Sequence, residues 1–198
     1  VLTQGEYVAK AASVAQELGV HTCAILTILA YESNGNPGAI GHDENVTSTS
    51  MANTIKSRRS FVAGTQTYSG AQIPAGTVVT SSKVNDDSGQ LVNGKLQLDG
   101  RFSHGIGLTQ ITFFPEPWVD TALNWNEYRN KPLQPRSISY AGHSITLTPE
   151  SALDADTNLL YGGILFKAGF DHCGGNIEQT WRSYASGSCT GTATTAVK

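Results

Sequence analysis

The sequence predicts a mainly α-helical protein of the α+β class, in which a helical domain carries an inserted lobe of strands and loops. Helical periodicity dominates residues 1–40 and returns after residue 105. Residues 45–98 between them are polar, rich in Ser, Thr, Gly and Asn, and contain short alternating stretches. We expect one domain over residues 1–198 with an insertion over 45–98, because the insertion has too few apolar residues for a core of its own.

Two helices are expected before the insertion. Thr3 and Glu6 have the spacing of a capping box, and Gly19 is placed to end the first helix. The second helix begins at about Thr22 and is buried by its Ile and Leu residues. It ends near Ser33, because the Asn-Gly-Asn-Pro sequence that follows is typical of a turn.

Further elements are expected inside and after the insertion. Asn93-Gly94 between apolar pairs predicts a hairpin turn. Apolar periodicity predicts a helix over residues 116–129, and alternation predicts a small hairpin over 137–146. A helix over 148–168 would begin with a Thr cap followed by Pro, and a last helix is expected over 176–186.

Composition and charge exclude several classes of protein. The net charge is −3, and the largest basic cluster is Lys56/Arg58/Arg59, which argues against a nucleic-acid partner. The longest apolar run, residues 23–31, is too short to span a membrane. No histidine has metal-ligand spacing, so we expect no metal and no cofactor. With 21 Gly and 15% charged residues, the chain has the composition of an extracytoplasmic or virion-associated protein.

Three cysteines are present, too few for a disulfide-based fold. Cys23 begins an apolar stretch and is expected to be a buried free thiol. Cys173 and Cys189 bracket a short helical segment, so a disulfide between them is expected if the compartment is oxidising.

Glu32 is the first candidate for chemistry. It stands at the end of an otherwise apolar helix, where desolvation of the carboxylate would raise its pKa. A glutamic acid that keeps its proton near neutral pH can act as a general acid. The alternative is a solvated glutamate at a helix end.

Two later segments carry weaker signals. Gly105-Ile-Gly107 would let the backbone approach a ligand closely, and Gln110 could hydrogen-bond an amide or a hydroxyl. The small residues that follow Asn158 in Asn-Leu-Leu-Tyr-Gly-Gly indicate either close helix packing or a functional motif. Tyr184 belongs either to the core or to a binding surface.

Taken in order, four segments resemble the motifs of the lysozyme-like lytic transglycosylases of the soluble type, which are related to goose-type lysozymes. The matching segments are Glu32-Ser33, Gly107-Leu108-Thr109-Gln110-Ile111, Asn158-Leu159-Leu160-Tyr161-Gly162 and Ser183-Tyr184-Ala185-Ser186-Gly187. The resemblance covers roughly residues 22–42 and 99–189. Thr109 stands where this family usually has Met, Ala185 where it usually has Asn, and the connection over 45–98 is longer than usual.

The resemblance implies a lysozyme-like helical domain that cleaves peptidoglycan glycan strands. Glu32 would be the sole acid/base at the MurNAc-β-1,4-GlcNAc bond, and the product would carry 1,6-anhydro-MurNAc. It also implies substrate-binding roles for Ser33, Ser103, His104, Gly107, Gln110, Tyr161 and Tyr184.

Two other functions stay open at this point. A muramidase of the goose-type-lysozyme kind would hydrolyse the same bond, with Asp99 or Asp43 placing the water. A glycan-binding or structural module of a phage or secretion machine would be catalytically silent. In each case we expect the 45–98 insertion to lie beside the substrate, because both of its ends border the proposed site.

Overall fold

The protein is a mixed α+β structure, described here by a computed structural model. The described part covers residues 2–41, 91–100, 104–114 and 130–191, with the backbone of five two-residue strands between residues 46 and 79. The chain forms two compact units. The first consists of residues 1–39, 107–111 and 136–198, and the second of residues 40–106 and 112–135.

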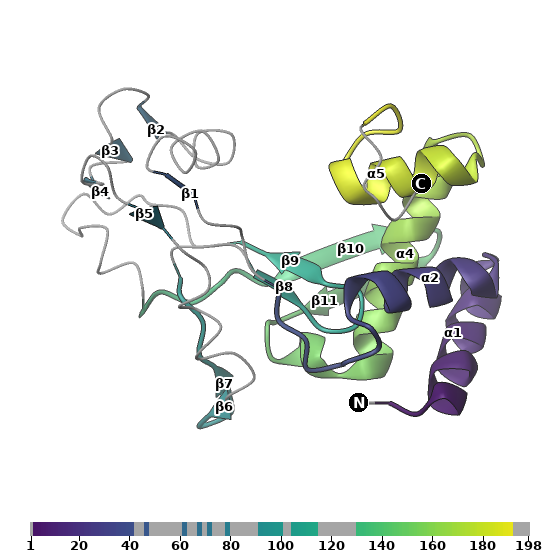
Figure 1. The fold of residues 1–198 in the computed structure, drawn as a ribbon, viewed down its shortest axis with the longest axis horizontal. Coiled ribbons are helices and arrows are strands. Elements are labelled where there is room, and N and C mark those ends of the chain that lie inside the picture. The colour runs from purple at the N-terminus through teal and green to yellow at the C-terminus, as the bar shows by residue number, and fades with distance from the viewer. Residues whose placement is uncertain are drawn as a thin grey trace. The chain divides into compact units, whose positions relative to one another are not determined.

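The first unit is built on four α-helices. They are α1 (Gln4–Leu18), α2 (Thr22–Glu32), α4 (Ala155–His172) and α5 (Ile177–Ser186). Helix α1 packs against both α2 and α4, and α5 packs against α4 (Figure 1). Three of these helices begin and end close to the positions expected from the sequence.

Local signals explain where these helices begin and end. Thr3 and Glu6 form the expected capping box at the start of α1, and Gly19 ends the helix at φ 65°. Asn176 caps α5 by accepting a hydrogen bond of 3.0 Å from the amide of Gln179, and Gly187 ends that helix at φ 78°. Both glycines adopt the left-handed conformation that other residues avoid.

The helix predicted over residues 148–168 is wrong at its start. A short 3-10 turn, η4 (Ser151–Leu153), comes first, and α4 begins only at Ala155. Asp154 is the true N-cap, because its carboxylate accepts a hydrogen bond of 2.9 Å from the amide of Thr157 while its own backbone is extended at ψ 123°. The helix then continues past the predicted end to His172.

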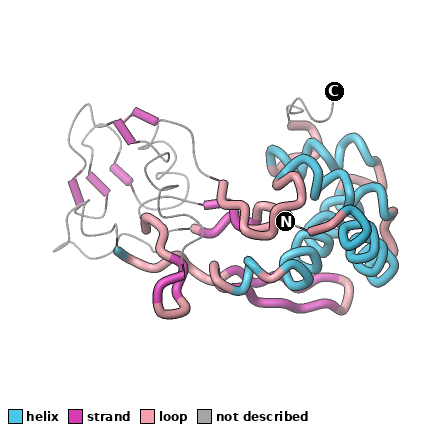
Figure 2. Tube along the Cα trace, turned by 60° about the horizontal axis from the view of Figure 1, so that its bottom comes forward, coloured by secondary structure: helices cyan, strands magenta, loops and turns pink. Residues whose placement is uncertain are grey.

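A β-hairpin completes the first unit. Strands β10 (Arg136–Tyr140) and β11 (His143–Leu147) pair antiparallel with Ile138 opposite Ile145, and both strands contact α4 (Figure 2). Ala141 and Gly142 form the turn at φ 50° and 82°. This hairpin was expected over 137–146, and Ile138 and Ile145 place its apolar face against the helical core.

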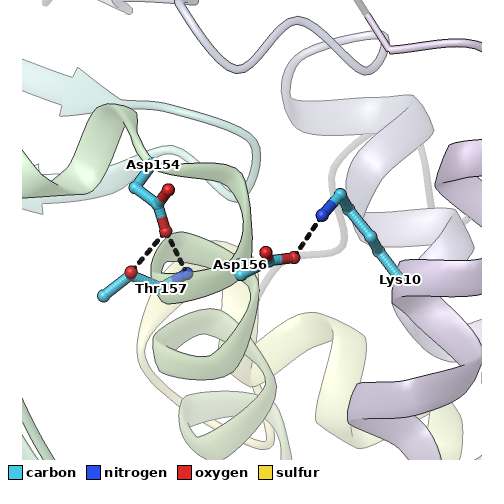
Figure 3. A network of polar contacts seen from close by, with 4 residues as sticks. All are labelled: Lys10, Asp154, Asp156 and Thr157. Atoms are coloured by element: carbon cyan, nitrogen blue, oxygen red, sulfur yellow. Dashed lines mark hydrogen bonds and ion pairs between the residues drawn. The ribbon is translucent and has the colours of Figure 1, made fainter.

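The core of the first unit joins α1, α2 and α4 to one loop. Its buried members are Ala11, Val14, Ala15, Leu18, Ile25, Leu29, Leu108, Leu159 and Ile164. Leu108 comes from the loop over residues 107–111 and is fully buried. At the surface, Lys10 of α1 forms an ion pair with Asp156 in the first turn of α4 (Figure 3).

The second unit is described in part. Strands β6 (Leu91–Val92) and β7 (Lys95–Leu96) form the hairpin predicted from Asn93-Gly94, whose residues have φ 51° and 72°. Strands β8 (His104–Ile106) and β9 (Ile111–Phe113) form another two-stranded sheet. The remaining strand pairs are formed by β1 (Val46–Thr47), β2 (Phe61–Val62), β3 (Thr67–Tyr68), β4 (Ala71–Gln72) and β5 (Val78–Val79).

Several predictions fall on residues outside the described ranges. The helix expected over 116–129 is one of them, and most of the 45–98 insertion is another. In the part of the chain that the structure describes, no helix is both long enough and apolar enough to cross a membrane.

The cysteines follow the sequence-based expectation in one respect and contradict it in another. Cys173 and Cys189 form the expected disulfide. Cys23 is a free thiol as expected, but it is exposed rather than buried. The residues of α2 that face the core are Ala24, Ile25, Ile28 and Leu29, so Cys23 lies on the opposite side of the helix.

The disulfide yields the first prediction. Under denaturing, non-reducing conditions a thiol reagent should label one cysteine, Cys23, and after reduction it should label three. Replacing both bridging cysteines with Ser should lower the free energy of unfolding by about 3 kcal/mol, as expected for a closed loop of this length. Three labelled thiols without reduction would contradict the pairing.

Candidate active site

Glu32 is the last residue of α2, and its side chain is half-buried. Burial raises the pKa of its carboxyl group, because desolvation penalises the charged form. The described residues supply no hydrogen bond to this carboxylate that would offset the penalty. Glu32 therefore holds its proton to a higher pH than an ordinary glutamate does.

The turn after α2 ties this end of the helix to the loop over residues 107–111. Ser33 Oγ donates a hydrogen bond of 2.8 Å to the carbonyl oxygen of Leu108. The hydroxyl oxygen of Ser33 also accepts a hydrogen bond of 3.2 Å from the amide of Gly35. The hydroxyl of Tyr7 on α1 in turn donates to the carbonyl of Gly35, so the turn is held from both sides.

The loop itself is fixed by its own side chain and by the segment before the second unit. Gln110 Nε2 donates to the carbonyl oxygens of Ala39 at 3.1 Å and of Gly107 at 2.9 Å. Both amide hydrogens of Gln110 are therefore used in bonds to the backbone, and its Oε1 is the side-chain atom that could accept a hydrogen bond from a ligand. The backbone of Gln110 lies at φ 49°, a left-handed conformation that is uncommon for a residue other than Gly.

Asn158 connects the loop to α4. Its Oδ1 accepts hydrogen bonds of 2.8 Å from both the amide and the hydroxyl of Thr109, and its Nδ2 donates to the carbonyl of Ala152 at 2.8 Å. Asn158 is fully buried and Thr109 is 2% exposed. A buried amide whose groups are satisfied in this way specifies one position for the loop.

Two glycines make this close approach possible. A Cβ on Gly107, which has φ 80°, would lie 2.2 Å from Nδ2 of Asn158. A Cβ on Gly162 would lie 2.4 Å from Oγ1 of Thr109. Loop and helix therefore fit together only with Gly at both positions.

Tyr184 reaches the loop from α5. Its hydroxyl donates a hydrogen bond of 3.1 Å to the carbonyl oxygen of Thr109. Burial raises the pKa of this hydroxyl far above its usual range, and the negative charge of Glu32 raises it further. Tyr184 and Glu32 belong to the same unit.

The expected site residues are thus distributed over the two units. The first unit brings together Glu32, Ser33, Gly107, Gln110, Tyr161 and Tyr184. Tyr161 is 2% exposed, so its ring packs inside the unit and has no open face on which a sugar could stack. In this arrangement it supports the site from within α4.

Asp99 and His104 belong to the second unit. Both are buried, and Nε2 of His104 lies 2.9 Å from the carbonyl oxygen of Asp99. A carbonyl can only accept, so this nitrogen carries the hydrogen. Ser103 and Asp43 lie outside the described residues.

The side chains of the first unit provide an acid and several hydrogen-bonding oxygens. They offer one carboxyl group with a raised pKa, the hydroxyl oxygens of Ser33 and Tyr184, and the amide oxygen of Gln110. Within the described ranges, no group of three or more His, Cys, Asp or Glu side chains is arranged to hold a metal ion. Proton transfer by Glu32 is the chemistry that these groups support.

The sequence analysis assigned no role to Thr109 or Asn158, which hold the loop in place. A usable signal was present, because Asn is a poor helix former and Asn158 stands in the first turn of α4 directly before two Leu residues. Such a residue is either exposed or hydrogen-bonded to something specific.

Comparison of the chain with protein-family models, with curated proteins and with solved structures gave no match.

The close contact at Gly162 yields a prediction. Gly162→Ala should destabilise the protein by about 1–3 kcal/mol, the usual cost of forcing an extra methyl group into a packed site. Gly5→Ala in α1 is the matched control, since nothing lies within 4 Å of its added Cβ. It should leave stability unchanged or raise it by about 1 kcal/mol, because Ala favours the helix. Equal effects in urea unfolding would contradict the fit.

A second prediction concerns the pH dependence of stability. Below the ordinary glutamate pKa of 4.5, Glu32 is protonated in both the folded and the unfolded state, and its burial has no electrostatic cost. As the pH rises through the higher pKa of the folded state, the buried carboxylate destabilises the protein. Glu32→Gln should therefore have a higher Tm than the wild type at pH 7–8, and the difference should vanish near pH 4.

The control for that measurement is Glu17→Gln. Glu17 is exposed and pairs with His143 at 3.4 Å, so its removal should give no gain in Tm at neutral pH. A Glu32→Gln variant that is no more stable than the wild type at pH 8 would show that burial does not disfavour this carboxylate.

Proposed function

We propose that the protein is a peptidoglycan lytic transglycosylase that cleaves the MurNAc-β-1,4-GlcNAc bond and leaves a 1,6-anhydro-MurNAc end. One observation carries the proposal: the carboxyl of Glu32 is half-buried at the end of an apolar helix, and burial raises its pKa. The resemblance of the surrounding motifs to the soluble lytic transglycosylases supplies the substrate and the reaction. A lysozyme-like helical domain is part of the same proposal.

Glu32 acts first as the general acid. Its proton passes to the glycosidic oxygen while positive charge develops on the anomeric carbon of the MurNAc residue. A carboxyl group in water is mostly ionised at neutral pH and has no proton to give. The desolvation at the end of α2 is what keeps this proton available.

Glu32 then acts as the general base. Its carboxylate accepts the proton of the C6 hydroxyl of the same sugar, and the C6 oxygen attacks the anomeric carbon to close the 1,6-anhydro ring. The proton lost in the first step is regained in the second, so the reaction consumes no water and one carboxyl group suffices. This differs from the two-carboxylate scheme of ordinary glycosidases.

The neighbouring groups have supporting roles. The Oε1 of Gln110 and the hydroxyl oxygens of Ser33 and Tyr184 belong to side chains that bond to the loop over residues 107–111, and each can accept a hydrogen bond from the substrate. Gly107 lets the backbone turn beside them. We assign Tyr161 to packing rather than to sugar binding, because its ring is buried.

The proposed partner is the glycan strand of peptidoglycan, met outside the cytoplasm, in the periplasm, at a cell surface or on a virion. The Cys173–Cys189 disulfide supports this location, since disulfides persist in oxidising compartments. Membership of a larger phage or secretion assembly belongs to the same proposal.

Digestion of purified sacculi followed by mass spectrometry of the products tests the function. We expect anhydro-muropeptides from the wild-type protein and a loss of turnover of at least about 100-fold in Glu32→Gln, because general acid–base catalysis contributes this much or more. The alkaline limb of kcat/KM should lie above the pKa of a free glutamate, since the acid must be protonated.

Glu17→Gln, which removes an exposed glutamate, should digest sacculi at the wild-type rate. Products with reducing ends would favour the muramidase and direct attention to Asp99 and Asp43. Binding to sacculi without cleavage would favour the non-catalytic module. Turnover that survives in Glu32→Gln would remove Glu32 from the acid role.

A further inference from the structure

We propose that the Cys173–Cys189 disulfide controls the acid Glu32 through α5: the oxidised protein holds α5 over the side of α2 that ends at Glu32, and reduction of the disulfide releases α5 and opens this carboxyl to water. The inference rests on the proposed function only in treating Glu32 as the acid. Every contact that carries it lies among described residues of the first unit.

One side of α2 leads to Glu32. Ala24, Ile28 and Glu32 are spaced by four residues, so they stand on the same side of the helix, one turn after another. Ala24 and Ile28 are buried in a cluster with Phe166 of α4, and Glu32 is half-buried. An element that covers this cluster therefore lies on the side of α2 where Glu32 stands.

Helix α5 covers this cluster. Trp181 and Tyr184 pack against it, and the ring centroid of Trp181 lies 5.2 Å from that of Phe166. The ring centroids of Trp181 and Tyr184 are 6.3 Å apart, in an edge-to-face arrangement. The two rings of α5 are thus part of the cover on the side of α2 that carries Glu32.

Helix α5 also reaches the end of α2. The hydroxyl of Tyr184 donates a hydrogen bond of 3.1 Å to the carbonyl of Thr109. The hydroxyl of Ser33, directly after Glu32, donates one of 2.8 Å to the preceding carbonyl, that of Leu108. Because both helices are anchored on consecutive carbonyl groups of one loop, the cover that α5 provides extends to the turn after Glu32. Release of α5 lets water reach this end of α2.

Helix α5 depends on the disulfide to stay in this place. It has 10 residues, fewer than the roughly 12 to 15 that an isolated helix needs to be stable in water. Thr180 is buried, but Ile177 is 49% exposed. The disulfide joins Cys173, the C-cap of α4, to Cys189 beyond the end of α5. Without this covalent bond, the end of α5 that carries Tyr184 is held to α4 by noncovalent contacts.

Reduction is a thiol–disulfide exchange with a dithiol. A thiolate of the dithiol attacks Sγ of Cys189, which is partly exposed, whereas Cys173 is buried. The S–S bond breaks, Cys173 leaves with the electron pair and takes up a proton, and a mixed disulfide joins the dithiol to Cys189. The second thiol of the dithiol then displaces Cys189. The protein gains two electrons and two protons, and the dithiol becomes a disulfide.

Control of this kind suits an enzyme whose substrate lies outside the cytoplasm. Cytosolic thiols keep disulfides reduced, and oxidising compartments allow them to form. In the reduced chain α5 is loose and Glu32 is solvated, so its carboxyl is ionised at neutral pH and has no proton for the glycosidic oxygen. Outside the cytoplasm, an oxidant that carries a disulfide reverses the exchange and completes the site.

The charges on the surrounding helices have partners other than Glu32. Several charged side chains of α1, α4 and α5 form ion pairs with one another, namely Lys10 with Asp156, Lys167 with Asp171, and Arg182 with Glu178. Burial is the cause that raises the pKa of Glu32, so loss of the cover should lower it again.

An NMR titration of the Glu32 carboxyl carbon tests the inference, with its signal assigned by its loss in Glu32→Gln. The labelled protein carries Cys23→Ser, because this exposed thiol could otherwise exchange with the disulfide. We expect reduction with dithiothreitol to lower the pKa of Glu32 toward that of an ordinary glutamate, and reoxidation to restore it. Cys173→Ser/Cys189→Ser should titrate like the reduced protein, with or without dithiothreitol.

Amide hydrogen exchange in the same samples follows α5 itself. We expect the amides of α5 to exchange faster after reduction, while those of α1 keep their rates. In the sacculus assay, reduction should lower kcat at neutral pH by about tenfold for each unit by which the pKa of Glu32 falls, since the protonated fraction of the acid falls by that factor.

Asp154→Ala is the matched control. It removes the N-cap of α4, at the opposite end of that helix from Cys173, and should lower Tm in both redox states. In the oxidised protein it should change neither the exchange of α5 nor the titration of Glu32. A shift of the Glu32 titration as large as the one on reduction would show that it follows general stability, and the inference would be wrong.

Three other results would overturn the inference. Amides of α5 that exchange no faster after reduction would show that α5 stays in place without the disulfide. Faster exchange of α5 with an unchanged Glu32 titration would show that α5 does not cover this carboxyl. Faster exchange of α1 as well would make the disulfide a general structural bond. Neither measurement needs a substrate, so an oxidised protein that fails to cleave sacculi would refute the proposed function and leave this test intact.

Discussion

The buried hydrogen bonds between Asn158 and Thr109 are the constraint on which the rest of the site depends. Oδ1 of one asparagine inside α4 accepts both the amide and the hydroxyl of a loop residue. That arrangement brings loop and helix so close that Gly107 and Gly162 have no room for a side chain. Leu108, the neighbour of Thr109, is thereby carried into the core shared by α1, α2 and α4. The loop is as much a part of the core as the helices are.

The loop also joins the catalytic candidate to the last helix. Ser33, directly after Glu32, donates to the carbonyl of Leu108, and Tyr184 donates to the next carbonyl along the chain. The end of α2 and the last turn of α5 therefore bond to two consecutive carbonyl groups of the loop. The position of α5 is supported by packing of Trp181 on Phe166 at 5.2 Å between ring centroids and by the Cys173–Cys189 disulfide beyond its ends. Each of these contacts lies within the first unit.

Local signals in the sequence were sufficient for most element boundaries and for the desolvation of one carboxyl group. Helix caps and hairpin turns depend only on residues close together in the sequence, so they could be predicted. The examples here are Thr3 with Glu6, Gly19, Asn93-Gly94 and Asn176. The start of α4 could not be predicted, because the sequence offers both Thr148 and Asp154 as N-caps. The structure shows that Asp154, whose backbone is extended, is the residue that caps the helix. The apolar run of α2 was enough to predict that Glu32 is desolvated. The exposure of Cys23 was missed because a run that is apolar throughout does not reveal which side faces the core.

The sequence by itself determined which residues could carry chemistry, namely a glutamate on an apolar helix, a Gly-rich loop and a tyrosine near the end of the chain. The tertiary structure decided what each of them does. It directs the amide hydrogens of Gln110 and the hydroxyl hydrogen of Tyr184 to backbone carbonyls, and it buries the ring of Tyr161. It also shows that Thr109 and Asn158 hold the loop against α4, a role that the sequence analysis did not assign to them. The physical reason is that a hydrogen-bonding role depends on which partner lies within about 3 Å. Asn158 is 49 residues from Thr109, and Tyr184 is 75 residues from it, so sequence spacing does not reveal these partners.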